Sequence, residues 1–201
     1  MFTYCLNNPV NYYDNTGIDA IWIQERNSAS GFGHTGLLVQ DSKGKWWYFY
    51  WGPADPNAFF LSMCFYTDEI CVFVDLGAHG PEIQDAEDVR AALQNSPNAS
   101  DARVGEQADD ITSIQYFTGD YTNTFEYLSY LSEPDTLDNP LVQYSLLFNN
   151  CSQQTVRVLS VSNPAFLTVD ALIPNYAHGQ ARIINTVQNI FSKVPQGVVK
   201  L

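Results

Sequence analysis

The fold is decided by residues 31–51, which read GFGHTGLLVQDSKGKWWYFYW. Residues 36–40 and 46–51 are two short, largely apolar runs, and the residues between them include the turn sequence Asp41-Ser42-Lys43-Gly44. Two runs of strand length that flank such a turn predict a β-hairpin. We therefore expect the two runs to be neighbouring antiparallel strands, with His34 at the entrance to the first of them.

Further apolar patterns complete a domain of the α+β class around this hairpin. Strand-like patterns predict additional strands at residues 18–24, 69–76 and 111–117. Helical spacing predicts helices at residues 85–94, 121–131, 151–161 and 180–193. We expect an antiparallel or mixed sheet of about five strands packed against helices, in one domain that spans residues 19–201.

Composition and charge restrict the partners. The net charge of −13 repels phosphate backbones and no Lys/Arg-rich run offsets it, so we do not expect nucleic acid as a partner. No apolar run has the length of a membrane span, and we expect none. The acidic residues concentrate between Glu82 and Asp110. We expect this segment to be a solvated, mobile insert, with a docking surface for a basic partner as the alternative.

The candidate nucleophile is Cys151, which follows Asn149-Asn150 and precedes a helical pattern of apolar residues. An Asn before such a pattern is a typical N-cap, so Cys151 is predicted in the first turn of a helix. There the helix dipole favours the thiolate, and the unpaired N–H groups can bind an oxyanion. The alternative is a buried structural thiol. The four cysteines lack zinc-site spacing, and we expect neither a metal nor an organic cofactor.

His34 is the candidate base, because a neutral imidazole can take a thiol proton and return it to a leaving group. Glycines on both sides of it allow close approach of a substrate or of another backbone segment. The alternative is a structural histidine at a tight strand entry. His79 and His178 fall in loop-like contexts, where we expect surface residues, although either remains an alternative base.

The remaining predicted site residues surround this pair. A third group usually orients the imidazole, and Tyr50 is the residue expected in that role; a dyad, or a backbone carbonyl as the third group, is the alternative. Trp47 and Trp51 are predicted to line an aromatic groove for an acyl chain, a sugar or a peptide, with core packing as the alternative. Asn150 and Gln153 are predicted beside the oxyanion, with an exposed helix position as the alternative for Gln153.

The order of these features resembles that of circularly permuted papain-like enzymes, which include the lecithin:retinol acyltransferase-like proteins. Gly33-His34-Thr35-Gly36 is similar to their histidine motif, and Asn150-Cys151 is similar to their cysteine motif. The resemblance implies a papain-like fold and a cysteine hydrolase or acyltransferase. Such an enzyme would act on an amide, isopeptide or ester bond through a thioacyl intermediate.

Residues 1–18 resemble the end of an Rhs-repeat core, on the matches Pro9, Asp14 and Gly17. Asn15 and Ile18 depart from that pattern, which has Pro and Leu there, and leave open whether the chain is cut at this point. The resemblance implies a C-terminal toxin domain that is secreted or delivered into a target cell by a specialised route. It also implies two partners, a cognate immunity protein and the Rhs core of the parent protein.

Two other classes of function remain open from the residues alone. The aromatic hairpin is also compatible with a non-catalytic domain that binds carbohydrate or protein. The acidic residues are also compatible with a toxin glycosidase.

Overall fold

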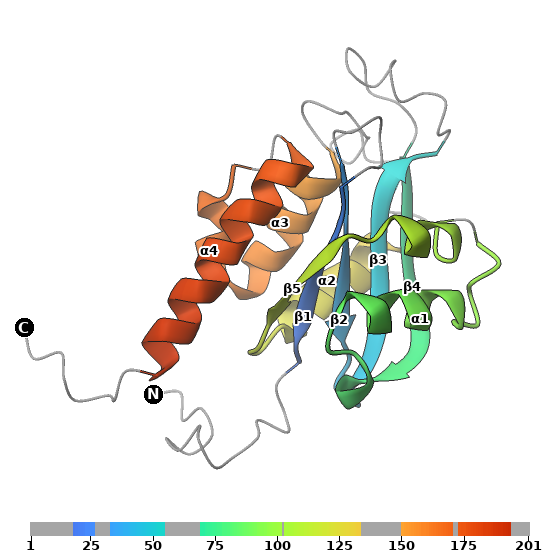
Figure 1. Ribbon diagram of the computed structural model, residues 1–201, viewed down its shortest axis with the longest axis horizontal. Coiled ribbons are helices and arrows are strands. Elements are labelled where there is room, and N and C mark those ends of the chain that lie inside the picture. The colour runs from blue at the N-terminus through green and yellow to red at the C-terminus, as the bar shows by residue number, and fades with distance from the viewer. Residues whose placement is uncertain are drawn as a thin grey trace, which may run out of the picture.

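The computed structural model describes residues 18–26, 33–54, 69–101, 103–133, 150–170 and 173–193. These residues form an antiparallel five-stranded sheet in the order β4-β3-β2-β1-β5, which confirms the α+β class (Figure 1). The strands are β1 (Ala20–Glu25), β2 (His34–Gln40), β3 (Lys45–Pro53), β4 (Glu69–His79) and β5 (Ser113–Phe117). The helices are η5 (Gly80–Glu82), α1 (Ala86–Gln94), η6 (Glu106–Asp110), α2 (Thr122–Leu131), α3 (Cys151–Ser162), η8 (Pro164–Thr168) and α4 (Pro174–Lys193).

The predicted hairpin is present as β2 and β3. Its turn is held by Asp41, whose carboxylate accepts hydrogen bonds from the backbone N–H groups of Lys43 at 2.8 Å and Lys45 at 3.0 Å. Gly44 takes a φ of 75°, in the left-handed region that glycine enters without steric cost. The turn chemistry visible in the sequence therefore sets the register of the two strands.

The sheet is covered on both faces. One face packs against α2, α3, η8 and α4 and carries Trp22, Leu37, Val39, Phe49 and Trp51. The opposite face packs against α1 and the segment that follows it (Figure 1). Because both faces are buried, the central strands read as nearly continuous apolar runs in place of a clean alternation.

The acidic segment between Glu82 and Asp110 is not the mobile insert that its composition predicted. Asp85 is the N-cap of α1 and accepts hydrogen bonds from the backbone N–H groups of Glu87 and Asp88, at 2.8 and 3.0 Å. Val89 and Leu93 on the opposite side of α1 are fully buried against the sheet. Several of the carboxylates therefore cap a packed helix or lie in its first turn, and a count of charges does not reveal these positions.

Helix α4 begins at Pro174, six residues before the predicted start. Proline is well tolerated in the first helical turn, whereas Gly179 interrupts the apolar spacing from which helices are recognised. The segment compared with an Rhs core lies outside the described residues except for Ile18, which is buried. None of the helices in the described ranges is both long and apolar enough to cross a membrane.

Candidate active site

Cys151 is the first residue of α3, as the sequence predicts. The Asn150 side chain accepts a hydrogen bond from the backbone N–H of Gln153 at 3.0 Å, and the Gln153 side chain accepts one from the backbone N–H of Asn150 at 2.9 Å. This reciprocal pair is a capping box, which satisfies two backbone donors at the start of the helix. Asn150 and Gln153 therefore fix the position of the cysteine, and their side chains are engaged in the cap.

The first turn of α3 lies where β2 and β3 separate. Paired residues of these strands run from Gln40 and Trp46 only as far as Leu37 and Phe49. Beyond that point β2 continues to His34 in register with β1, and β3 continues to Pro53 in register with β4. At this end the sheet is thus split into two halves, and α3 packs against the inner strand of each (Figure 1).

Hydrogen bonds from Thr35 link the Cys151 sulfur to the start of β2. The backbone N–H and the side chain of Thr35 hydrogen-bond the sulfur, and so does the backbone N–H of Ser152. The Thr35 hydroxyl also lies 3.2 Å from the hydroxyl of Thr155, one turn further along α3. Two backbone donors from different elements therefore converge on the sulfur, and an anion formed there would find the same donors.

The sequence argument for a low thiol pKa is not supported by this environment. Cys151 is only 2% exposed. Burial raises the pKa of the Cys151 thiol to about 11, although the hydrogen bonds from Thr35 act in the opposite direction. Removal of the charged form from water therefore outweighs the helix-end donors, and the resting sulfur is a protonated thiol.

His34 is buried at the first position of β2, and its ring packs on the ring of Tyr50. The two ring centroids are 4.6 Å apart, and the ring planes make an angle of 32°. Burial lowers the pKa of His34 to about 3, so the imidazole is neutral near pH 7. The Nε2 atom is buried and has no hydrogen-bond partner in the described part of the chain.

The geometry brings His34 and Cys151 to the same end of the split, without a hydrogen bond from Nε2 to the sulfur. Thr35, which follows His34, contacts Cys151. Side chains alternate along a strand, so the His34 ring faces the α1 side whereas Thr35 faces α3. Cys151 nevertheless lies within electrostatic range of Tyr48 and Tyr50, whose raised pKa values owe most to burial and a smaller part to Glu25 and Cys151.

Two glycines make room for the tyrosine rings beside His34. A Cβ atom at Gly36 would lie 2.8 Å from a ring carbon of Tyr48, and one at Gly52 would lie 2.6 Å from the hydroxyl oxygen of Tyr50. Both distances are too short for a side chain at those positions. The glycine after Thr35 in the Gly-His-Thr-Gly motif therefore has a packing role in this fold.

The predicted aromatic groove is part of the core. Trp51 is fully buried in the cluster between the sheet and helices α2 to α4. Trp47 lies near the turn end of β3, where it packs on Phe73 and Phe125 at centroid distances of 5.2 and 5.6 Å. The prediction that Trp47 and Trp51 form a groove beside His34 is therefore not supported by their positions, because an aromatic strand buried on both faces has no free side.

His79 and His178 were both predicted at the surface, and only His178 is instead buried. His79 is exposed at the end of β4, opposite Lys45. Its partner Lys45 is five residues from Tyr50 along β3, which at ~3.3 Å per residue separates His79 from the His34–Tyr50 contact by about 17 Å. His178 is only 6% exposed and makes an edge contact with Trp22, at a centroid distance of 6.3 Å. Burial, with smaller contributions from Arg26 and Arg182, lowers the pKa of His178 to about 4.

Sequence reasoning missed Thr35 and Glu25. Thr35 stands inside the Gly-His-Thr-Gly motif, but the sequence does not predict its contact with Cys151. Glu25 ends β1, is 0% exposed, and is the paired residue of His34 across the two strands. The available signal for Glu25 was its place one alternation beyond Ile21 and Ile23, which puts a carboxylate on a core face.

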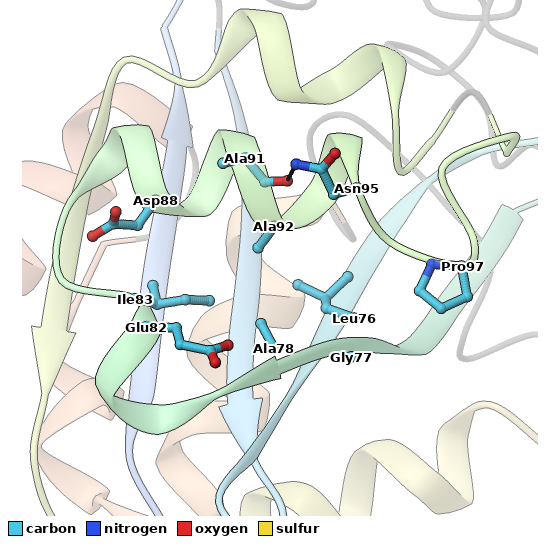
Figure 2. Close-up of a pocket in the computed structure, with 10 residues that line it drawn as sticks. All are labelled: Leu76, Gly77, Ala78, Glu82, Ile83, Asp88, Ala91, Ala92, Asn95 and Pro97. Atoms are coloured by element: carbon cyan, nitrogen blue, oxygen red, sulfur yellow. Dashed lines mark hydrogen bonds between the residues drawn. The ribbon is translucent and has the colours of Figure 1, made fainter.

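A surface hollow lies away from this site. It measures about 470 Å³ and sits between the end of β4 and α1 (Figure 2). Leu76, Ala78 and Ile83 provide apolar surface, and the carboxylates of Glu82 and Asp88 lie toward one end (Figure 2). Both carboxylates accept backbone hydrogen bonds, from His79 and from Gln84 and Asp85. None of the predicted site residues lines this hollow.

Among the described residues, no group of three or more His, Cys, Asp or Glu side chains is arranged to hold a metal ion. Comparisons of the chain with protein-family models, with curated proteins and with solved structures give no match.

Proposed function

We propose that this chain is a cysteine-dependent hydrolase or acyltransferase with a permuted papain-like layout, in which Cys151 is the nucleophile and His34 the base. The observation that carries the proposal is the position of the sulfur. It lies at the first turn of α3 in the split between β2 and β3, where backbone donors from Thr35 and Ser152 converge on it. A carbonyl oxygen that becomes negative on attack would be bound by N–H groups of the same helix end.

The chemistry begins from a neutral pair, because burial raises the pKa of the thiol and lowers that of the imidazole. Because the His34 ring faces the α1 side and its Nε2 makes no hydrogen bond to the sulfur, we propose that the S–H proton crosses the split to His34 by way of one water molecule. The sulfur electron pair attacks the carbonyl carbon of an amide, isopeptide or ester as the proton leaves. The imidazolium then gives its proton to the leaving amine or alcohol. Water or a second nucleophile resolves the thioacyl intermediate, so no metal and no organic cofactor enters the reaction.

Tyr50 supports the base by packing. Its ring covers one face of the His34 ring across the split, at a centroid distance of 4.6 Å. This contact limits rotation of the imidazole. In other cysteine and serine enzymes a third residue orients the imidazole by a hydrogen bond. We place the substrate contacts around the split, because the aromatic strand β3 is largely buried.

The biological setting that we propose is an antibacterial toxin domain, on the resemblance of residues 1–18 to the end of an Rhs core. In that setting the domain is secreted or delivered into a target cell, and its partners are the parent Rhs core and a cognate immunity protein. The net charge of −13 supports a partner with a basic surface and disfavours nucleic acid.

The test uses Cys151→Ala with Cys71→Ala as the matched control, because Cys71 is a half-buried thiol on β4. Purified proteins are incubated with p-nitrophenyl acetate, and acetylation of each cysteine is followed by peptide mass spectrometry. In parallel, growth is measured in bacteria that produce each variant. We expect loss of acetyl transfer and of growth inhibition in Cys151→Ala only. A folded Cys151→Ala variant that retains both would rule out the nucleophile.

A further inference from the structure

The hollow between β4 and α1 exists because the residues that face each other across it are small. Gly77 and Ala78 line it from the end of β4, and Ala91 and Ala92 line it from α1 (Figure 2). None of these side chains is long enough to fill the space between the strand and the helix. The remaining volume of about 470 Å³ falls within the range of about 300 to 1,000 Å³ that is usual for ligand pockets. The hollow can therefore take one long side chain of a partner protein together with a neighbouring one.

The floor of the hollow is apolar. Leu76 and Ile83 are 3% and 1% exposed and belong to the core beneath α1. Ala78 and Ala92 add half-buried methyl groups beside them. A group that covers this floor removes apolar surface from water, which favours its binding.

Two carboxylates border the same hollow, those of Glu82 and Asp88 (Figure 2). Glu82 is exposed and Asp88 is half-buried, so water reaches both. Each accepts backbone hydrogen bonds, but neither forms an ion pair within the described ranges. The ion pairs there are Lys45 with Asp75, Arg90 with Glu87, and Arg103 with Asp101. Both carboxylates can therefore receive a cation from outside the chain.

The charge around the hollow decides which occupant fits it. Residues 82–110 contain eight acidic and two basic side chains. Both basic side chains are already engaged, Arg90 with the carbonyl oxygen of Ile111 at 2.6 Å and Arg103 with Asp101 at 3.4 Å. The two carboxylates of the hollow belong to no group of three metal-ligating side chains in the part of the chain that the structure describes. An organic cation with an apolar stem therefore matches the hollow better than an anion, a neutral group or a metal ion.

We propose that the hollow is the docking site for an arginine side chain of a partner protein that has a basic surface. The planar guanidinium presents several N–H donors to the carboxylates, while its methylene stem packs on the apolar floor. An apolar neighbour in the partner fills the rest of the hollow. Arginine is also among the residues that most often dominate the binding energy of protein interfaces. The inference rests on the basic partner in the proposed function and not on the chemistry of Cys151, because α3 covers the opposite face of the sheet.

The probe is the peptide acetyl-Leu-Arg-Leu-amide, titrated into the isotopically labelled full chain and followed by NMR. We expect shifts of the backbone amide signals of Ala78 and Ala92, which lie on the two walls of the hollow. The same peptide with citrulline in place of arginine keeps the shape and loses the charge, so it should bind about tenfold more weakly. Equal binding of the citrulline peptide, shifts confined to other parts of the chain, or no shift at about 10 mM peptide would overturn the arginine site.

A second comparison separates docking of a protein from binding of a free cation. Acetyl-arginine-amide carries the same charge without the apolar neighbours, so it should bind about fivefold more weakly than the peptide. Equal binding of the two compounds would overturn the proposal that the apolar floor receives part of a partner protein.

Variants of the chain test the two parts of the hollow. Glu82→Gln combined with Asp88→Asn removes both charges and keeps an oxygen acceptor for each backbone hydrogen bond, whereas Ala92→Leu fills the space without changing the charge. Each should weaken peptide binding about tenfold. Glu87→Gln is the matched control, because Glu87 lies on the same helix, pairs with Arg90 and does not line the hollow.

Unchanged binding in the variants of the hollow, or an equal loss in Glu87→Gln, would overturn the docking site. Acetyl transfer to Cys151 should stay the same in all of these variants. Retained transfer in Cys151→Ala would instead overturn the proposed nucleophile, so the two failures are distinguishable.

Discussion

The imidazole of His34 lies on the phenol ring of Tyr50 across the gap left where β2 and β3 stop pairing. Their centroids are 4.6 Å apart, and the rings are tilted by 32°. Burial keeps both side chains in their neutral forms near pH 7, with the pKa of His34 lowered and that of Tyr50 raised. The contact is therefore a packing contact between neutral rings, which limits rotation of the imidazole.

Substitutions at Tyr50 should separate packing from hydrogen bonding. Tyr50→Phe keeps the ring and removes the hydroxyl, so we expect acetyl transfer to Cys151 within about threefold of the unsubstituted protein. Tyr50→Leu removes the ring, a contact worth about 1 kcal/mol beyond its area, and we expect at least a tenfold loss. Rates with p-nitrophenyl acetate measure both. A large loss in Tyr50→Phe would show that the hydroxyl, and not the ring, orients His34.

Acid should destabilise the domain through its buried histidines. The folded-state pKa values of His34 and His178 are lowered to about 3 and about 4, below the ordinary 6.5. At pH values between 6.5 and these folded-state pKa values, the unfolded chain binds more protons than the folded chain. The unfolding free energy is therefore highest above pH 6.5 and falls as the pH falls. Between pH 7.5 and pH 5 each histidine should cost about 2 kcal/mol of unfolding free energy.

Urea denaturation at the two pH values measures this loss. A His34→Asn variant, compared at both pH values with the unsubstituted protein, should lose about half of the pH dependence. His178→Asn is the matched control for the second buried ring and should remove a similar part. Identical pH dependence in all three proteins would contradict the assignment of neutral, buried histidines.

The sequence predicted the structural features that local interactions determine. The Asp41 to Gly44 turn, the Asn150 cap and the start of α3 at Cys151 depend on residues close together in the chain, and all three are present. The sequence did not predict the state of the thiol, because that depends on how many distant atoms exclude water from Cys151. Glu25 was missed for the same reason, since its burial beside His34 depends on the pairing of β1 with β2.

The cap of α3 should matter for the cysteine as well as for stability. Asn150→Ala removes the acceptor for the Gln153 N–H and should lower the unfolding free energy by about 1 kcal/mol. It should also change the alkylation rate of Cys151, because the helix end then frays beside the sulfur. Asp85→Ala removes the equivalent cap of α1 and should cost a similar amount with no effect on Cys151. Equal alkylation rates in the two variants would contradict a link between cap and nucleophile.

Gly36 should tolerate no side chain, because the Tyr48 ring occupies the space above it. A Cβ atom there would lie 2.8 Å from Tyr48 and 3.3 Å from the carbonyl oxygen of Phe49, so either the ring or the backbone of β3 must move. We expect Gly36→Ala to lower the unfolding free energy by about 1 to 3 kcal/mol, the usual cost of overpacking. Gly179→Ala is the matched control, since a Cβ atom there meets nothing within 4 Å and the residue lies inside α4. That variant should gain about 0.5 to 1 kcal/mol from helix propensity. Urea denaturation measures both changes, and a gain in stability in Gly36→Ala would show that Tyr48 does not lie against the His34 strand.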